Sequence, residues 1–175
     1  MQLIRGCLMM LGLVALLFVT SCVVGVSGCN RMVNPREFGQ TVREDPDKTR
    51  RMVSDFLESA TYEDTDVAGR TLAAKVQDYT DGSVHLTGDA NGERLIEITV
   101  TFQPARDGKA TRVDVVSDAG PLAAALDDGS TAPELHRAIR YQLDGALAAI
   151  DEHRVLPRGM TIRRLIAEAK GSKRR

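Results

Sequence analysis

Three dipeptides, Asp81-Gly82, Asn91-Gly92 and Asp107-Gly108, constrain the fold of this 175-residue chain more than any other feature. Asn-Gly and Asp-Gly pairs favour tight hairpin turns, because the turns that match the twist of paired strands need positive φ angles. The turns separate four runs of strand-forming sequence. These runs cover residues 71–79, 83–88, 94–104 and 110–117. The short connections between them predict a four-stranded antiparallel meander.

The third and fourth runs alternate between apolar and polar side chains. Glu97 and Thr99, for example, each lie between two apolar residues. Such alternation is typical of an antiparallel sheet with one face buried and the other in water. The positions predicted to face inward are Ile96, Ile98, Val100, Phe102, Val113 and Val115.

Two amphipathic helices are expected to cover the apolar face of this sheet. The first begins after Asp45, a favourable N-cap, with Pro46 in the first helical position. The second begins at a capping box in residues 131–134 and runs to about Arg154, because the approaching Pro157 disfavours its continuation. The sequence therefore predicts an α+β two-layer sandwich, with an N-terminal helix, a four-stranded antiparallel meander and a long C-terminal helix.

A long helix after a meander resembles the helix-grip, START-like lipid-binding domains. In that family a curved sheet grips such a helix around a cavity, so the resemblance implies a carrier of a lipid or another apolar molecule. Those domains also have more strands, including one ahead of the first helices. No pattern for the additional strands is evident in this sequence.

The N-terminal segment limits where the protein can reside. After a start that carries Arg5, residues 7–28 contain no charged side chain. A run of this length can span a bilayer. Its order, with a positive start, an apolar centre and small residues at the end, is also that of a secretory signal peptide.

The end of this run, Val26-Ser27-Gly28-Cys29, resembles the lipobox of bacterial lipoproteins. In that family the cysteine thiol is acylated and the preceding peptide is removed, so the resemblance implies lipidation of Cys29 with acyl chains such as palmitate. The segment ending at Cys22 fits the box loosely. Cys29 is preferred because the chain becomes polar directly after it.

Two alternatives to the lipoprotein remain open. The apolar run would form an uncleaved signal-anchor helix if its cysteines were only apolar filler. A metal or redox use of Cys22 and Cys29 is disfavoured, because the segment contains no His, Asp or Glu ligand. The domain organisation expected from the whole chain is a signal peptide (1–28), a lipidated N-terminus and linker (29–44), a single α+β domain (45–156) and a basic amphipathic tail (157–175).

Charge is distributed unevenly although the formal net charge is −1. Residues 154–175 contain eight basic side chains and one acidic side chain, whereas residues 30–153 contain 14 basic and 23 acidic ones. The apolar residues of the tail share one helical face, which either contacts a membrane or partner or docks on the domain itself. The predicted membrane or partner contacts are Arg158, Arg163, Arg164, Lys170, Lys173, Arg174 and Arg175.

No motif for catalysis or metal binding is evident. The three histidines, His85, His136 and His153, lie far apart, lack metal-ligand spacing and are expected on the surface. Ser83 and Ser117 have no nucleophile-elbow sequence around them. The absence of Trp and an aromatic content of 4% disfavour stacking on nucleic acid. The sequence predicts a non-enzymatic protein with no cofactor, no metal site and no nucleic-acid partner.

The expected function is that of a lipid-anchored envelope protein, held by its acyl chains outside the cytoplasmic membrane or in the periplasm. Its small domain would bind a partner or support an envelope complex, and the basic tail would contact an anionic envelope polymer or protein. The alternatives are a START-like carrier and a single-pass signal-anchored membrane protein. A cavity between sheet and long helix would favour the carrier, and a filled core would favour the interaction domain.

Overall fold

The structure, a computed structural model, describes residues 36–127 and 130–172, all within one compact unit that comprises Pro35–Arg175. The predicted signal peptide, Cys22, Cys29 and the terminal residues Lys173, Arg174 and Arg175 lie outside the described residues. Among the helices within the described ranges, none is both long enough and apolar enough to cross a membrane.

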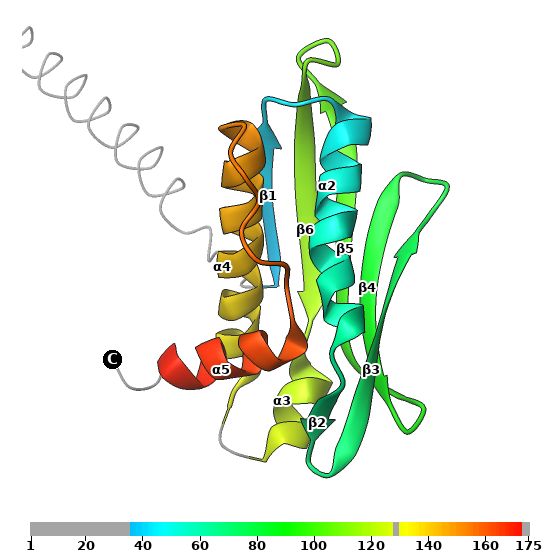
Figure 1. Cartoon of the computed structure of the whole chain (residues 1–175), viewed down its shortest axis with the longest axis vertical. Helices are drawn as coiled ribbons and strands as arrows, with labels where there is room; N and C mark the ends of the chain where they lie inside the picture. The colour runs from blue at the N-terminus through cyan, green and yellow to red at the C-terminus, as the bar shows by residue number, and fades with distance from the viewer. Residues whose placement is uncertain (1–35, 128–129, 173–175) are drawn as a thin grey trace, which may run out of the picture. The chain divides into compact units, whose positions relative to one another are not determined.

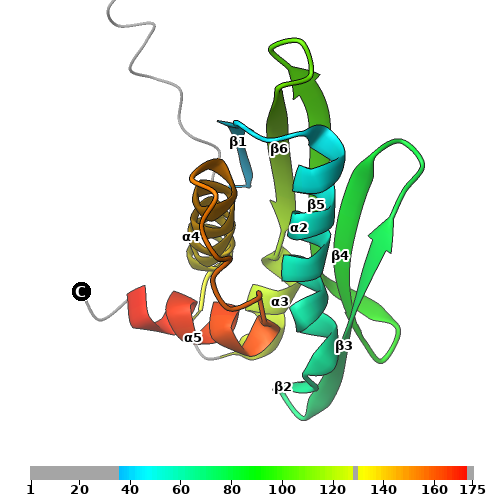
Figure 2. The ribbon, with the colours of Figure 1, turned by 45° about the horizontal axis from the view of Figure 1, so that its top comes forward.

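The domain is an α+β two-layer structure, as predicted, with one twisted antiparallel sheet and helices over one of its faces (Figures 1 and 2). The sheet order is β1-β6-β5-β4-β3-β2. The strands are β1 (Glu37–Val42), β2 (Thr65–Val67), β3 (Arg70–Asp78), β4 (Ser83–Ala90), β5 (Glu93–Ala105) and β6 (Ala110–Asp118). The helices are α2 (Pro46–Glu58), the 3-10 helix η1 (Ser59–Tyr62), α3 (Gly120–Leu126), α4 (Ala132–Asp151) and α5 (Ile162–Ser172).

The predicted meander is confirmed as the four strands β3 to β6. Each predicted turn connects the expected pair of strands, and the observed strand bounds differ from the predicted ones by at most two residues. Asn91 and Gly92 adopt φ angles of 53° and 81°, and Asp107 and Gly108 adopt 57° and 79°. These positive angles are the reason that the turns contain Asn-Gly and Asp-Gly pairs.

Two further strands were not predicted. β1 lies in the segment 29–44 that was expected to be a linker, and it pairs with β6, where Phe38 lies opposite Val115. β1 is an edge strand whose apolar alternation is weak, and its partner β6 begins only at Ala110, far along the chain. β2 has only three residues and pairs with the start of β3. β1 therefore supplies the strand ahead of the first helix that the helix-grip resemblance implies.

Both predicted helices are present and begin where their caps indicated. The Asp45 carboxylate accepts hydrogen bonds from the backbone N–H groups of Asp47 and Lys48, at 3.0 and 3.1 Å. α4 begins after the predicted capping box, in which the Glu134 carboxylate accepts from the Thr131 backbone N–H at 2.9 Å. It ends at Asp151, three residues before the predicted end.

Aliphatic side chains fill the layer between the sheet and the two helices. α4 contacts β1 and β6, and α2 contacts β3, β4, β5 and β6. The inner side chains of both layers belong to one buried cluster. The fully buried members that face each other across this layer include Ile98, Val100, Val113, Val115, Leu135, Ile139, Leu143 and Leu147.

The domain is larger than the predicted range 45–156. Val42 in β1 is part of the buried cluster, and so is the apolar face of α5. The buried side chains of that face are Ile162, Leu165, Ile166 and Ala169. The tail helix is thus built into the domain through the same apolar stripe that the sequence indicated, and its basic side chains lie on the other sides.

Candidate ligand site between α2, α4 and α5

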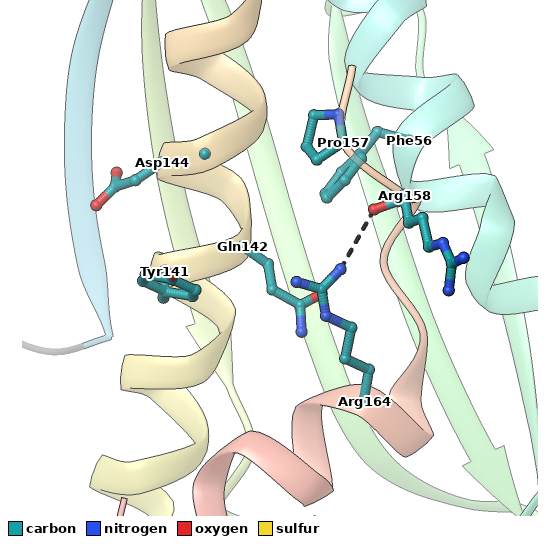
Figure 3. Close-up of a pocket in the computed structure, with 8 residues that line it drawn as sticks. Phe56, Tyr141, Gln142, Asp144, Pro157, Arg158 and Arg164 are labelled. Atoms are coloured by element: carbon teal, nitrogen blue, oxygen red, sulfur yellow. Dashed lines mark hydrogen bonds between the residues drawn. The ribbon is translucent and has the colours of Figure 1, made fainter. Parts of the chain in front are cut away.

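A pocket of about 390 Å³ lies where α2, α4 and the start of α5 meet (Figure 3). We call it the junction groove. Helix α4 contributes Tyr141, Gln142, Asp144 and Gly145 to its lining. The remaining lining residues are Phe56 from α2, Pro157 and Arg158 from the connection between α4 and α5, and Arg164 from α5.

The groove exists because the connection after α4 returns to the end of α2. The backbone N–H of Met160 donates to the carbonyl of Phe56 at 3.0 Å. Gly159 permits this approach, because a Cβ atom built there would lie 2.2 Å from Ser59 Cβ and 3.1 Å from Phe56 O. A side chain at residue 159 would therefore push the connection away from α2 and open the groove.

A second hollow, of about 500 Å³, continues from the first and shares Pro157, Arg158 and Arg164 with it. Its other lining residues are Glu63, Gly159 and Thr161. No strand residue lines either hollow. Both therefore lie outside the layer between sheet and α4, where the START-like cavity was expected.

Of the two guanidinium groups in the groove, that of Arg164 has hydrogen-bond partners within the domain. Its Nε donates to Glu168 Oε1 at 2.8 Å, and its Nη1 donates to the carbonyl of Arg158 at 3.5 Å (Figure 3). The Gln142 side chain donates from Nε2 to Glu168 Oε2 at 3.0 Å. Glu168 therefore holds Arg164 and Gln142 side by side and neutralises the charge of Arg164.

Two polar groups of the groove have no partner among the described residues. The guanidinium of Arg158 is exposed and makes no hydrogen bond or ion pair there. Gln142 is 3% exposed, and its Oε1 atom is buried without a donor. The groove thus offers a positively charged donor at its surface and an unpaired acceptor in its wall.

The described members of the predicted contact set do not form one site. Arg158 and Arg164 line the groove, whereas Arg163 is directed to the carbonyl of Asp64, at 3.3 Å from its Nη2. Lys170 is exposed further along α5. Sequence reasoning missed the other half of the groove, above all Phe56 and Tyr141.

The signal for Tyr141 was available but ambiguous. It lies outside the apolar stripe of α4 and is 71% exposed, so it is an aromatic residue that the fold does not bury. An exposed aromatic ring is common enough on protein surfaces that it does not by itself mark a site. Tyr141 becomes part of a pocket only because residues 157–164 fold back beside α4.

A polar cluster around His85 has part of the arrangement of a catalytic triad. Ser83 Oγ lies 3.1 Å from His85 Nε2, and Glu97 Oε1 lies 3.8 Å from Nδ1. However, Ser83 Oγ also donates to Asp81 Oδ1 at 2.7 Å, and this bond lowers the pKa of the Asp81 carboxyl. A carboxylate can only accept, so the serine proton is held by Asp81 and not by the histidine. The cluster links β4 to the turn before it.

The expected surface position of His136 is wrong. The residue is 1% exposed, because β1 and β6 cover a wider face of α4 than the single apolar stripe. Ser117 Oγ lies 2.9 Å from His136 Nδ1, while Nε2 is buried without a hydrogen-bond partner among the described residues. Burial lowers the pKa of His136, and the positive charge of Arg36 lowers it further against the opposing effect of Asp118.

The acidic side chains of the described ranges, among them Glu63, Asp64 and Asp66, form no metal centre. Across residues 36–127 and 130–172, no three His, Cys, Asp or Glu side chains are placed to hold one ion. Asp66 instead accepts a hydrogen bond from the Gly69 backbone in the turn before β3, at 3.1 Å.

Comparison with known proteins adds weak similarities of fold. No family model matches the chain, and no curated protein sequence matches it. One similar solved structure is the di-domain ARO/CYC BexL from the BE-7585A biosynthetic pathway, with a TM-score of 0.43 and 14% identity. The match covers 66% of this chain and 44% of BexL, so this chain spans less than half of that protein.

Two smaller proteins are also similar. Ara h 8.0201 has a TM-score of 0.40 and 16% identity, over 67% of this chain and 94% of that one. A START superfamily protein from Mycobacterium smegmatis has a TM-score of 0.32 and 12% identity, over 47% of this chain and 74% of that one. All three are similar to this chain only distantly, both in sequence and in superposition.

Proposed function

We propose that this protein is a lipid-anchored, non-enzymatic binding domain of the bacterial cell envelope. The filled layer between sheet and α4 supports a domain that binds at its surface, because aliphatic side chains already occupy the interior. The junction groove and the second hollow beside it lie outside this layer, on the helical side. This contrast between a closed interior and an open junction is the observation on which the proposal rests.

Acylation of Cys29 would place the domain close to the bilayer. β1 begins at Glu37, which leaves the seven residues 30–36 between the proposed anchor and the first strand. A fully extended chain of that length reaches at most about 25 Å. The domain would therefore work within one domain diameter of the membrane surface.

The basic side chains of the tail would then contact an anionic surface of the envelope through electrostatic attraction alone, without insertion of apolar side chains. The apolar face of α5 is buried in the domain core and is not free to enter a bilayer. Arg158, Arg163 and Lys170 are exposed. Each basic residue near an anionic surface contributes about 1 kcal/mol, and salt screens this attraction over about 8 Å at physiological ionic strength.

A carrier of lipid or another apolar molecule is the second candidate, and β1 is the observation that favours it. This strand gives the chain the helix-grip order in which related domains enclose a ligand. A carrier requires a cavity between the sheet and α4. Leu143 and Leu147 are fully buried there, so they would have to move apart to admit a ligand. Native mass spectrometry of the purified protein separates the two, because a carrier retains an apolar molecule of defined mass.

Metabolic labelling with a clickable fatty acid, combined with intact mass, tests the anchor in the wild type, Cys29→Ala and Cys22→Ala. We expect label on a protein that begins at residue 29, retained in Cys22→Ala and lost in Cys29→Ala. Unlabelled protein that keeps residues 1–28 would overturn the proposal, and the apolar run would then be an uncleaved anchor.

A further inference from the structure

We propose that the junction groove binds an amphiphilic organic acid, with the carboxylate held by Arg158 and the apolar body lying against Phe56, Tyr141 and Pro157. This inference rests on the proposed role as a binding domain, and it adds the chemical class of the ligand. It does not depend on acylation of Cys29.

The size and walls of the groove suit a small amphiphile. A volume of about 390 Å³ lies within the range of pockets that bind small organic molecules. Phe56 forms a buried apolar part of the wall, while Tyr141 comes from α4 and Pro157 from the connection after it (Figure 3). A phenol ring with an exposed face and a proline ring are both apolar surfaces on which an alkyl or aromatic group can lie.

The charges around the groove favour a carboxylate over a cation. Asp144 is paired with Arg140, at 3.3 Å between Oδ2 and Nε, and Arg164 is paired with Glu168. Arg158 remains as the groove's unpaired cation among the described residues. Glu63 lines the second hollow together with Arg158, but no ion pair joins the two among the described residues. A guanidinium binds a carboxylate through two parallel hydrogen bonds, which few other side chains can offer.

Gln142 provides an independent reason to expect a ligand. Its Oε1 atom is a buried carbonyl oxygen without a donor among the described residues, and Gln142 lines the groove. An unpaired buried acceptor is costly, so a ligand that carries an N–H or O–H donor would be favoured over one that does not. An acylated amino acid has this combination of a carboxylate, an amide N–H and an apolar chain.

The full-length protein in phosphatidylcholine nanodiscs tests the proposal with N-octanoylglycine as the probe. Binding is measured by calorimetry after subtraction of empty nanodiscs, and hydrogen–deuterium exchange locates it. We expect saturable binding with protection of residues 141–145 and 157–164. The uncharged analogue N-octanoylglycinamide should bind at least about tenfold more weakly, because it lacks the charge-assisted hydrogen bonds to Arg158.

Two pairs of variants separate the site from general charge and stability. Arg158→Gln should weaken binding at least about tenfold, whereas Arg137→Gln, at an exposed arginine of α4 outside the groove, should change it less than about twofold. A Cβ at Gly145 meets nothing within 4 Å, so Gly145→Leu can start a side chain there without a backbone clash and is expected to occupy part of the groove and weaken binding. Gly171→Leu, at an equally open glycine away from the groove, is its control.

Three results would overturn the proposal. The first is no saturable binding of the acid by the wild type, and the second is equal weakening by Arg158→Gln and Arg137→Gln. The third is protection of the groove by phosphatidylglycerol nanodiscs but not by the free acid, which would make it a lipid-headgroup contact. None of these results alters the labelling of Cys29, so failure of the ligand and failure of the anchor are distinguishable.

Discussion

The two faces of α4 differ in how completely they are covered. On the inner face Leu143 and Leu147 are fully buried, in the layer between the helix and a continuous sheet of hydrogen-bonded strands. On the outer face Tyr141 and Gly145 border a hollow, because the returning segment 157–164 touches only part of the helix. One helix therefore contributes to stability with one face and to a candidate site with the other.

The largest expected difference is in the free energy of unfolding, when one side chain on each face of α4 is truncated to alanine. Leu143→Ala should lower the free energy of unfolding by about 2–5 kcal/mol, since it leaves a cavity in a packed layer. Tyr141→Ala, in the same turn of the helix, should change it by less than about 0.5 kcal/mol, because the ring is largely exposed. Chemical denaturation measures both. Equal losses would show that the outer face is packed as tightly as the inner one.

A smaller effect is expected from two glycines, Gly145 in the lining of the junction groove and Gly159 in the lining of the second hollow. Gly159→Ala should destabilise the protein by about 1–3 kcal/mol, because the new methyl group meets Ser59 and the end of α2. Gly145→Ala should stabilise it by up to about 1 kcal/mol, since alanine is the better helix former and the position is open. The thermal unfolding midpoints of the two variants should move in opposite directions. A neutral Gly159→Ala would mean that the connection is not held against α2.

The smallest effect concerns His136, where the inner face of α4 meets β6. Its pKa is lowered in the folded protein, so the unfolded chain binds the proton more readily below the ordinary value of 6.5. Unfolding therefore takes up a proton, and stability should fall as the pH drops below 6.5. The groups that set this behaviour are Arg36, which disfavours the charged ring, and Asp118, which favours it.

Replacing His136 with Leu should flatten this part of the stability profile. Urea denaturation between about pH 7.5 and about pH 5 measures it, because this window includes the ordinary histidine pKa. Leu143→Ala is the control, because it should lower stability at every pH without changing the slope. An unchanged slope in the His136 variant would assign the acid sensitivity to other groups. Ser117 loses its imidazole contact in this variant, so a constant loss of stability is expected as well.

Much of the fold was predictable because its signals are local. Asn-Gly and Asp-Gly pairs favour the positive φ angles that Asn91, Gly92, Asp107 and Gly108 adopt, and the alternation beside them specifies which face is buried. Asp45 caps α2 through hydrogen bonds to residues two and three positions later. In each case the residues that interact are close in the sequence.

The junction groove was not predictable because its parts are distant in the sequence. Phe56, Tyr141 and Pro157 come from three separate segments, and Gly159 has a role only once the end of α2 lies against it. Arg158 and Arg164 were identified through their charge, but the charge pattern did not distinguish them from Arg163, which faces Asp64. Tertiary packing made that distinction.

The sequence by itself determined the turns, the caps, the apolar stripes of α4 and α5 and the signals on which the lipid anchor is proposed. Each depends on dihedral preferences or on a period of two or about 3.6 residues, which neighbouring residues encode directly. Only the tertiary structure decided that β1 pairs with β6, that His136 is buried and that the tail helix closes one side of a groove. Those outcomes depend on which surfaces of distant segments fit together, and no local pattern carries that information.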